Sequence, residues 1–279
     1  MELTAHTRAL IELALMEDMS GGDITTRATI TDDHGSRAVV TAKEDIVLAG
    51  IEVFKAVFKQ LGGDVLCTEK VTDGDFISGG MAVMEVEGST ATLLGGERTA
   101  LNFLMRLSGI ATLTRRCVDS IAGTGATVVD TRKTTPGWRY LEKYAVRMGG
   151  GRNHRYSLSD GVLIKDNHIT ASGGITEAVN RAKKTAPHTS RIEVEVSTTE
   201  QITEALNVGA DILLLDNMTP DEIADAVTLI DGRALIEASG GITLENIRKY
   251  AEAGVDFISL GALTHGARSV DINMKIVAV

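Results

Sequence analysis

Basic side chains are concentrated in one segment of an otherwise acidic chain. Between positions 132 and 168 there are eight Lys or Arg residues and three acids, a net charge of +5, whereas the 279-residue chain has a formal net charge of −10. Such a cluster can bind a small, multiply charged anion, because Arg contacts carboxylates through two hydrogen bonds and Lys supplies a compact charge. The charge count alone fits a solvated surface equally well. The eight residues are Arg132, Lys133, Arg139, Lys143, Arg147, Arg152, Arg155 and Lys165.

Two carboxylates stand at the ends of apolar runs that are typical of buried strands. Glu195 lies near the end of residues 192–196, and Asp216 directly follows residues 212–215. A buried charge needs a partner, so we expect each to face a metal ion, a cation or a hydroxyl donor. Together they could hold Mg²⁺ or stabilise a positive transition state, with a pair of structural salt bridges as the alternative. Glu193 shares the strand face of Glu195, which is favoured because it lies nearer the strand end.

Two glycine turns could bind phosphate. Ser239-Gly240-Gly241 stands between an expected strand and an expected helix that starts near Thr243, and Gly261 follows the last expected strand. Backbone N–H groups approach a phosphate closely at glycine, and a helix N-terminus adds a favourable dipole. The same pentapeptide pattern recurs at residues 172–176, so position in the fold carries the prediction rather than the string itself.

One histidine is the best candidate for a ligand role. His154 lies between Asn153 and Arg155, directly after three glycines. His168 and His265 are weaker candidates, because a single histidine more often has a structural role.

The elements that must position these residues fall into two parts. The first hundred residues mix short helical and strand-like stretches, as in a compact α+β domain, and residues 97–121 then form a long helix pattern. From residue 127 onward, short apolar strands alternate with amphipathic helices, which indicates a parallel sheet covered on both faces. Only six strands are clear, so we predict an incomplete parallel α/β barrel, in which function lies at the carboxyl ends of the strands. The expected strands are 127–130, 162–164, 192–196, 212–215, 235–238 and 257–260, and the helices between the later ones are 175–184, 199–208, 220–230 and 244–253.

Composition narrows the class of protein. Hydrophobic residues make up 43% of the chain and charged residues 24%, an ordinary globular balance. Cys67 and Cys117 are too far apart in sequence for a zinc-binding pair and are expected to be reduced thiols. No apolar run reaches the length of a membrane span, and the N-terminus does not resemble a signal peptide. We therefore expect a cytoplasmic protein, and the acidic net charge argues against nucleic-acid or membrane partners.

Longer motifs extend through nearly the whole chain. They are residues 22–26, 97–102, 107–112, 130–137, 149–155 and 163–168. Together they resemble the quinolinate phosphoribosyltransferase family, whose members are also called carboxylating nicotinate-nucleotide pyrophosphorylases. The resemblance implies that quinolinate and phosphoribosyl diphosphate react, with Mg²⁺, to give nicotinate mononucleotide, carbon dioxide and diphosphate in de novo NAD biosynthesis.

The resemblance also implies an architecture. An N-terminal α/β sandwich (residues 1–105) would precede an open α/β barrel (residues 106–267), and the tail (268–279) would return to the first domain. The active form would be a homodimer or larger, in which Arg98 completes the neighbouring subunit's site.

Roles for individual residues follow from the same resemblance. The quinolinate pocket would contain Arg132, His154, Arg155 and Lys165, with Arg98 from the other subunit. The site for phosphoribosyl diphosphate would contain Lys133, Ser239, Gly240, Gly241, Gly261 and His265. Glu195 and Asp216 would hold Mg²⁺, and the catalytic candidates are Lys133, Lys165, Glu195 and Asp216.

Two other interpretations remain. A pyrophosphorylase-like group associated with molybdate transport shares the Thr-Arg-Lys and His-Arg elements, but it departs from this chain at residues 165–167. Residues 73–88 resemble the hairpin of a lipoyl or biotinyl carrier, which requires a Lys at an exposed tight turn. The nearest candidate, Lys70, lacks that setting.

Overall fold

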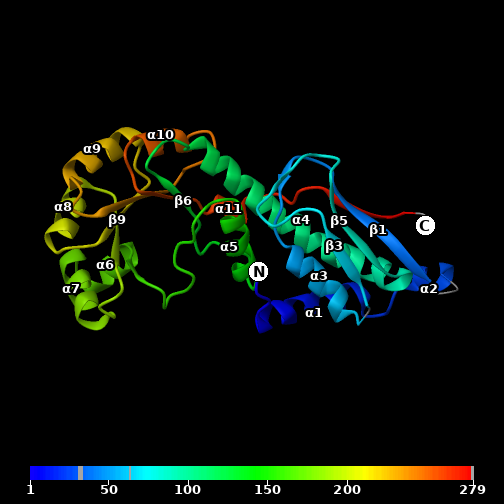
Figure 1. Cartoon of the computed structure of the whole chain (residues 1–279). Helices are drawn as coiled ribbons and strands as arrows, with labels where there is room; N and C mark the ends of the chain where they lie inside the picture. Colours follow the sequence, from blue (N-terminus) through cyan, green and yellow to red (C-terminus); the bar gives the residue numbers. More distant parts are fainter. Residues whose placement is uncertain (31–33, 63, 278–279) are drawn as a thin grey trace. The chain divides into compact units, whose positions relative to one another are not determined.

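The structure is a computed structural model that describes residues 1–30, 34–62 and 64–277 (Figure 1). The chain divides into two compact units. The first contains Met1–Arg115, Thr135–Gly150 and Gly266–Val279, and the second contains Arg116–Thr134 and Gly151–His265. The domain boundary expected after residue 105 falls inside helix α4 (Thr90–Ser120). The expected boundary therefore does not coincide with the end of a helix or strand.

The first unit is built on a four-stranded antiparallel sheet in the order β12-β1-β5-β3. The alternating burial of β1 places Ala38, Val40 and Ala42 in the core. The last strand, β12, pairs along β1 from Arg37 opposite Val277 to Ala42 opposite Ile272. The strands are β1 (Gly35–Ala42), β3 (Leu66–Glu69), β5 (Ala82–Ser89) and β12 (Ile272–Val277), beside a small pair formed by β2 (Ile46–Val47) and β4 (Phe76–Ile77). The shorter helices before α4 are α1 (Ala5–Met19), α2 (Ile24–Thr29) and α3 (Ile51–Gln60).

Helix α5 (Arg139–Met148) of the first unit has no counterpart in the sequence prediction. It lies inside the basic segment and buries Glu142 completely. The carboxylate of Glu142 accepts hydrogen bonds from Arg106 at 2.9 Å and from the backbone N–H of Thr135 at 3.0 Å. The basic segment is therefore not one pocket, because the part that carries α5 belongs to the first unit.

The second unit contains a six-stranded sheet in the order β6-β11-β10-β9-β8-β7, with every pairing parallel. The chain thus combines an antiparallel-sheet unit with an open parallel α/β unit, which confirms the predicted fold class. The strands are β6 (Thr127–Val129), β7 (Val162–Ile164), β8 (Ile192–Val196), β9 (Ile212–Asp216), β10 (Leu235–Ser239) and β11 (Phe257–Ser259). The helices that follow strands β7 to β11 are α6 (Asp166–Ser172), α7 (Ile175–Thr185), α8 (Thr199–Asn207), α9 (Pro220–Ile230), α10 (Ile247–Glu252) and α11 (Ala262–His265).

Helix starts show how local side chains set these boundaries. Helix α9 begins as predicted, with Thr219 as N-cap and a reciprocal hydrogen bond between Thr219 and Glu222. Helix α10 begins at Ile247 rather than at residue 244, which corrects the expected helix start near Thr243. The cause is the side chain of Asn246, whose Oδ1 accepts the backbone N–H of Thr243 at 2.7 Å and closes a turn there.

No helix within the described ranges combines the length and the apolar character that a bilayer crossing requires. Lys70 follows β3 and forms an ion pair with Glu85 of β5 at 2.9 Å, so it is not presented as a carrier lysine would be.

Candidate active site

A pocket of about 330 Å³ lies at the carboxyl ends of the parallel strands, within the second unit. Four of the eight basic residues of the basic segment line it. Arg132 and Lys133 follow β6, Lys165 follows β7, and Arg155 follows the glycine-rich segment 149–151. This concentration of positive charge suits an anion with several negative groups. The lining residues are Thr131, Arg132, Lys133, His154, Arg155, Leu163, Lys165, Leu214, Asp216, Glu237, Ser239 and Ser259.

Asp130 fixes the segment that carries His154 and Arg155. It follows β6 and is fully buried. Its carboxylate accepts a hydrogen bond from Nδ2 of Asn153 at 2.6 Å and another from the backbone N–H of His154 at 2.9 Å. A buried carboxylate that accepts two hydrogen bonds is held in one place, so the residues after it are positioned relative to the end of β6.

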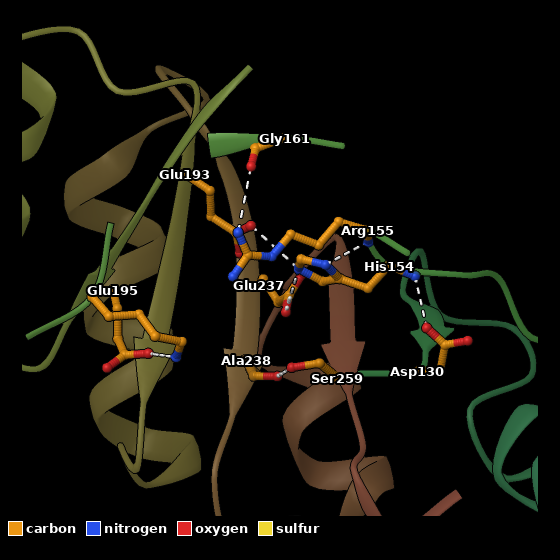
Figure 2. Close-up of polar contacts among 10 residues, drawn as sticks. Asp130, His154, Arg155, Gly161, Glu193, Glu195, Glu237, Ala238 and Ser259 are labelled. Carbon is orange, nitrogen blue, oxygen red and sulfur yellow. Dashed lines mark hydrogen bonds and ion pairs between the residues drawn. The ribbon is translucent and has the colours of Figure 1, made fainter. Parts of the chain in front are cut away.

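Beneath the pocket, His154 meets two buried acids, which Figure 2 shows converging from neighbouring parts of the sheet. Nε2 of His154 lies 3.2 Å from Glu193 Oε2 and 3.6 Å from Glu237 Oε1. Glu193 belongs to β8 and Glu237 to β10, and both are about 95% buried (exposed fractions of 5% and 4%). The sequence pattern favoured Glu195 over Glu193, and Glu237 was noted only as a polar residue near a strand end, with no role assigned.

Burial also shifts the pKa values of two charged residues around His154, Glu237 and Arg155. Burial first, and then the nearby charge of Glu193, raise the pKa of Glu237 to about 7. Burial also lowers the pKa of the Arg155 guanidinium, and the neighbouring positive charge of Arg132 lowers it further. The floor of the pocket is therefore a desolvated layer in which charges act strongly on one another.

Lys165 and Glu195 form an ion pair, so Glu195 has a cation as its partner in this structure. The Lys165 side chain is half-exposed, whereas that of Glu195 is largely buried. The backbone N–H of Lys165 donates to Nδ1 of His168 at 3.0 Å, which fixes the start of α6. Asp216 accepts a hydrogen bond from Nδ2 of Asn217 at 2.7 Å. Both carboxylates lie at the ends of adjacent strands, β8 and β9, and offer the hard oxygen donors that Mg²⁺ prefers.

The glycine at position 240 is required by its neighbours. Gly240 has φ +91°, and a Cβ there would stand 2.3 Å from Oδ1 of Asn217. Asn217 itself has φ +57°, and its backbone N–H donates to Ser239 at 2.9 Å. The ends of β9 and β10 thus approach more closely than any larger residue would permit.

The second glycine turn brings three predicted residues together. A Cβ on Gly261 would lie 2.8 Å from Cδ of Lys133 and 3.2 Å from the ring of His265. The hydroxyl of Thr264 donates to the carbonyl of Lys133 at 2.7 Å. Lys133, Gly261 and His265 therefore form one cluster beside the pocket.

Arg98 lies on α4 in the first unit, where its side chain is exposed.

One further arrangement could accept a cation. His154, Glu193 and Glu237 bring their ligand atoms within 4.8 Å of one another. The 3.2 Å contact between His154 and Glu193 is a hydrogen-bond distance, so the geometry is accounted for without an ion.

Family models match both parts of the chain. Residues 23–108 match the N-terminal domain of quinolinate phosphoribosyl transferase, and residues 110–275 match its C-terminal domain. The chain belongs to the quinolinate phosphoribosyltransferase family. A probable carboxylating nicotinate-nucleotide pyrophosphorylase of Bacillus subtilis is 44% identical over 269 residues, covering 96% of this chain and 93% of the relative. A protein of the same name from Methanocaldococcus jannaschii is 44% identical over 284 residues, covering 99% of each chain.

Solved structures of this family share the fold. The nicotinate-nucleotide pyrophosphorylase of Francisella tularensis superposes with a TM-score of 0.94 at 37% identity, covering 98% of this chain and 96% of the other. The match extends over both units.

Proposed function

We propose that the pocket at the carboxyl ends of the strands joins quinolinate to the ribose of phosphoribosyl diphosphate. The enzyme makes nicotinate mononucleotide, carbon dioxide and diphosphate in NAD biosynthesis, the activity for which its relatives are named. The observation that carries the assignment is the set of four cationic side chains around one pocket of about 330 Å³: Arg132, Lys133, Arg155 and Lys165. A dicarboxylate and a diphosphate both require such charges.

Quinolinate occupies the part of the pocket between Arg132, His154, Arg155 and Lys165. Two Arg side chains can bind a carboxylate through paired hydrogen bonds, and Lys165 adds a point charge at the mouth. Arg98 is exposed on α4, and in our proposal it reaches the quinolinate site of a second subunit in a homodimer.

Phosphoribosyl diphosphate occupies the side of the pocket that the two glycine turns form. Its phosphates lie against the backbone of Ser239, Gly240 and Gly241 and against the cluster of Lys133, Gly261 and His265. The open space beside Gly241 and the closeness of the Lys133 side chain to Gly261 support this placement, because a phosphate can approach backbone N–H groups at glycine. Helix α10 starts too far along the chain, at Ile247, to contribute its dipole there.

Mg²⁺ is part of the proposal, and the donor set fits it. Asp216 lines the pocket, and Glu195 lies at the end of the adjacent strand. Glu195 would have to exchange its contact with Lys165 for the ion, which leaves Lys165 to bind quinolinate. When bound, Mg²⁺ would neutralise the diphosphate and make it a better leaving group.

The residues of the pocket account for both chemical steps. As the C–O bond to diphosphate breaks, Glu195 and Asp216 stabilise the positive character of the ribose while the quinolinate nitrogen attacks its anomeric carbon. The ring nitrogen is then cationic, so the electron pair of the departing 2-carboxylate can remain on the ring carbon, which takes up a proton. Lys165 holds quinolinate and Lys133 holds the phosphates during this sequence.

The reduced thiols expected for Cys67 and Cys117 accord with a cytoplasmic enzyme.

A competition between substrates tests this function. The purified protein is incubated with phosphoribosyl diphosphate and Mg²⁺ and offered either quinolinate or nicotinate. We expect nicotinate mononucleotide from quinolinate only, because nicotinate lacks the second carboxylate that the cationic pocket binds. Turnover of nicotinate without turnover of quinolinate would overturn the substrate assignment.

A further inference from the structure

His154 rests on two buried acids that the proposed function leaves unused. Glu193 and Glu237 project from β8 and β10 into the interior of the parallel unit, where carboxylates are costly unless they are paired. Each retains one buried oxygen, Oε1, without a hydrogen-bond partner. Two acids kept in such surroundings require a reason beyond packing.

The hydrogen bonds of His154 define which ring nitrogen carries the proton. Nδ1 accepts the backbone N–H of Arg155 at 2.7 Å, so the proton must be on Nε2. Nε2 points at Glu193 Oε2, 3.2 Å away, with Glu237 Oε1 at 3.6 Å. The ring is therefore held from both sides, by the main chain of Arg155 and by the acids.

Glu193 acts from the side away from the substrate, and Glu237 lies between the two sides. A second pocket of about 600 Å³ lies toward the amino ends of the strands, beside Val162, Ile212 and Phe257. His154 and Glu237 line both pockets, whereas Glu193 lines the second one. Figure 2 shows Arg155 running beside the same group, with its guanidinium directed toward Gly161 (3.4 Å).

We propose that Glu193 and Glu237 are positioning residues that fix His154 and, through its Nδ1, the main chain of Arg155 in the geometry that quinolinate requires. Glu193 contributes more, because its oxygen is at hydrogen-bond distance from Nε2. Small displacements of groups that orient a substrate reduce binding and turnover steeply. This inference rests on the proposed function only for the identity of the ligand.

The direction of the change in quinolinate binding distinguishes a positioning role of the acids from a purely electrostatic effect of their charge. A negative carboxylate below an anion pocket weakens anion binding through its field alone, so its removal would strengthen quinolinate binding. If the acids position His154, removing Glu193 must weaken quinolinate binding instead. The two explanations therefore predict changes of opposite direction.

The test replaces Glu193 with Met, which removes the acceptor at similar size, and compares it with Glu237→Gln and with Asp256→Asn. Asp256 is a matched control in the same unit, since its carboxylate accepts the backbone N–H of Ile236 at 2.8 Å, at the start of β10. For Glu193→Met we expect the KM for quinolinate to rise about tenfold, equivalent to ~1.4 kcal/mol. Glu237→Gln should have a smaller effect, and the KM for phosphoribosyl diphosphate should change less than twofold in all three.

A spectroscopic measurement accompanies the kinetics and needs no substrate. Nitrogen-15 NMR of labelled histidine reports the protonated ring nitrogen, and wild-type His154 should show the Nε2–H tautomer in a single state. In Glu193→Met we expect the Nε2 resonance of His154 to shift and broaden, because its acceptor is lost, and in Asp256→Asn we expect the wild-type spectrum. A lower or unchanged quinolinate KM, an equal rise in both KM values, or an unchanged Nε2 resonance in Glu193→Met would overturn the inference. Wild-type protein that fails to use quinolinate would instead contradict the proposed function, whatever the histidine spectrum shows.

Discussion

Replacing Glu237 with Gln should make the protein more stable than the wild type at pH 8, although the residue lies in the floor of the active-site pocket. Glu237 is about 95% buried, and burial together with Glu193 raises its pKa from 4.5 to about 7. A carboxylate whose pKa is raised on folding stabilises the folded state only while it stays protonated. That contribution is complete below the unfolded pKa and is lost as the pH rises through the folded value.

The size of this effect follows from the shift. At 1.36 kcal/mol per pKa unit, a rise from 4.5 to about 7 corresponds to ~3 kcal/mol. Gln has the shape of the protonated acid and cannot ionise, so the variant avoids this loss. The stability difference between Glu237→Gln and wild type should therefore be small at pH 4.5 and reach up to ~3 kcal/mol at pH 8.

Urea unfolding monitored at several pH values measures this difference. Glu222→Gln is a control of opposite sign, because the hydrogen bonds that Glu222 accepts from Thr219 lower its pKa. It should be less stable than wild type at pH 8, with the deficit shrinking as the pH falls. A stability difference for Glu237→Gln that does not change with pH, or a variant less stable than wild type at pH 8, would refute the reasoning.

Three further substitutions test separate parts of the account. Lys165→Ala should raise the KM for quinolinate about 10- to 100-fold through loss of a charge-assisted contact, and unchanged KM and kcat in steady-state assays would exclude the pocket assignment. Gly240→Ala should cost about 1–3 kcal/mol in thermal unfolding, because its φ is positive and its Cβ would meet Asn217, so a variant of wild-type stability would contradict the close approach. Glu142→Gln should lower the free energy of unfolding by about 3 kcal/mol, since Glu142 is the buried partner of Arg106, and an unchanged urea midpoint would show that the pair is not stabilising.

Sequence patterns predicted the second unit well because its strands are short, largely apolar runs separated by amphipathic helices. The strands at residues 162–164 and 192–196 begin and end where predicted, and in the second one the buried Ile192, Val194 and Val196 mark the strand although two acids interrupt it. Polar residues directly after those runs marked the pocket, which contains Arg132, Lys165 and Asp216.

The rest depended on contacts that sequence does not reveal. Helix α5 was overlooked because four of its ten residues are charged and interrupt the apolar pattern, and the burial of Glu142 follows only from its partners in the folded unit. Glu193 and Glu237 were not selected because an acid inside an apolar run gives no sign of what it faces. The start of α10 depends on one side-chain hydrogen bond from Asn246.

The dimer proposal for Arg98 can be tested by mixing two variants, each impaired on its own, and measuring activity at a quinolinate concentration well below their raised KM. Arg98→Ala and Lys165→Ala proteins, unfolded and refolded together, should recover about a quarter of the wild-type activity, because mixed dimers contain one intact site. No recovery from dimers shown to be mixed would place Arg98 outside the neighbouring site.

The most direct test of the account follows the fate of the 2-carboxylate of quinolinate. Quinolinate labelled at that carboxylate is turned over with phosphoribosyl diphosphate and Mg²⁺, and labelled carbon dioxide is measured against nicotinate mononucleotide. We predict one carbon dioxide for each nucleotide formed, with all of the label in the gas. Nucleotide that retains the label, or carbon dioxide released without consumption of phosphoribosyl diphosphate, would contradict the assignment of the pocket as a decarboxylating phosphoribosyltransferase site.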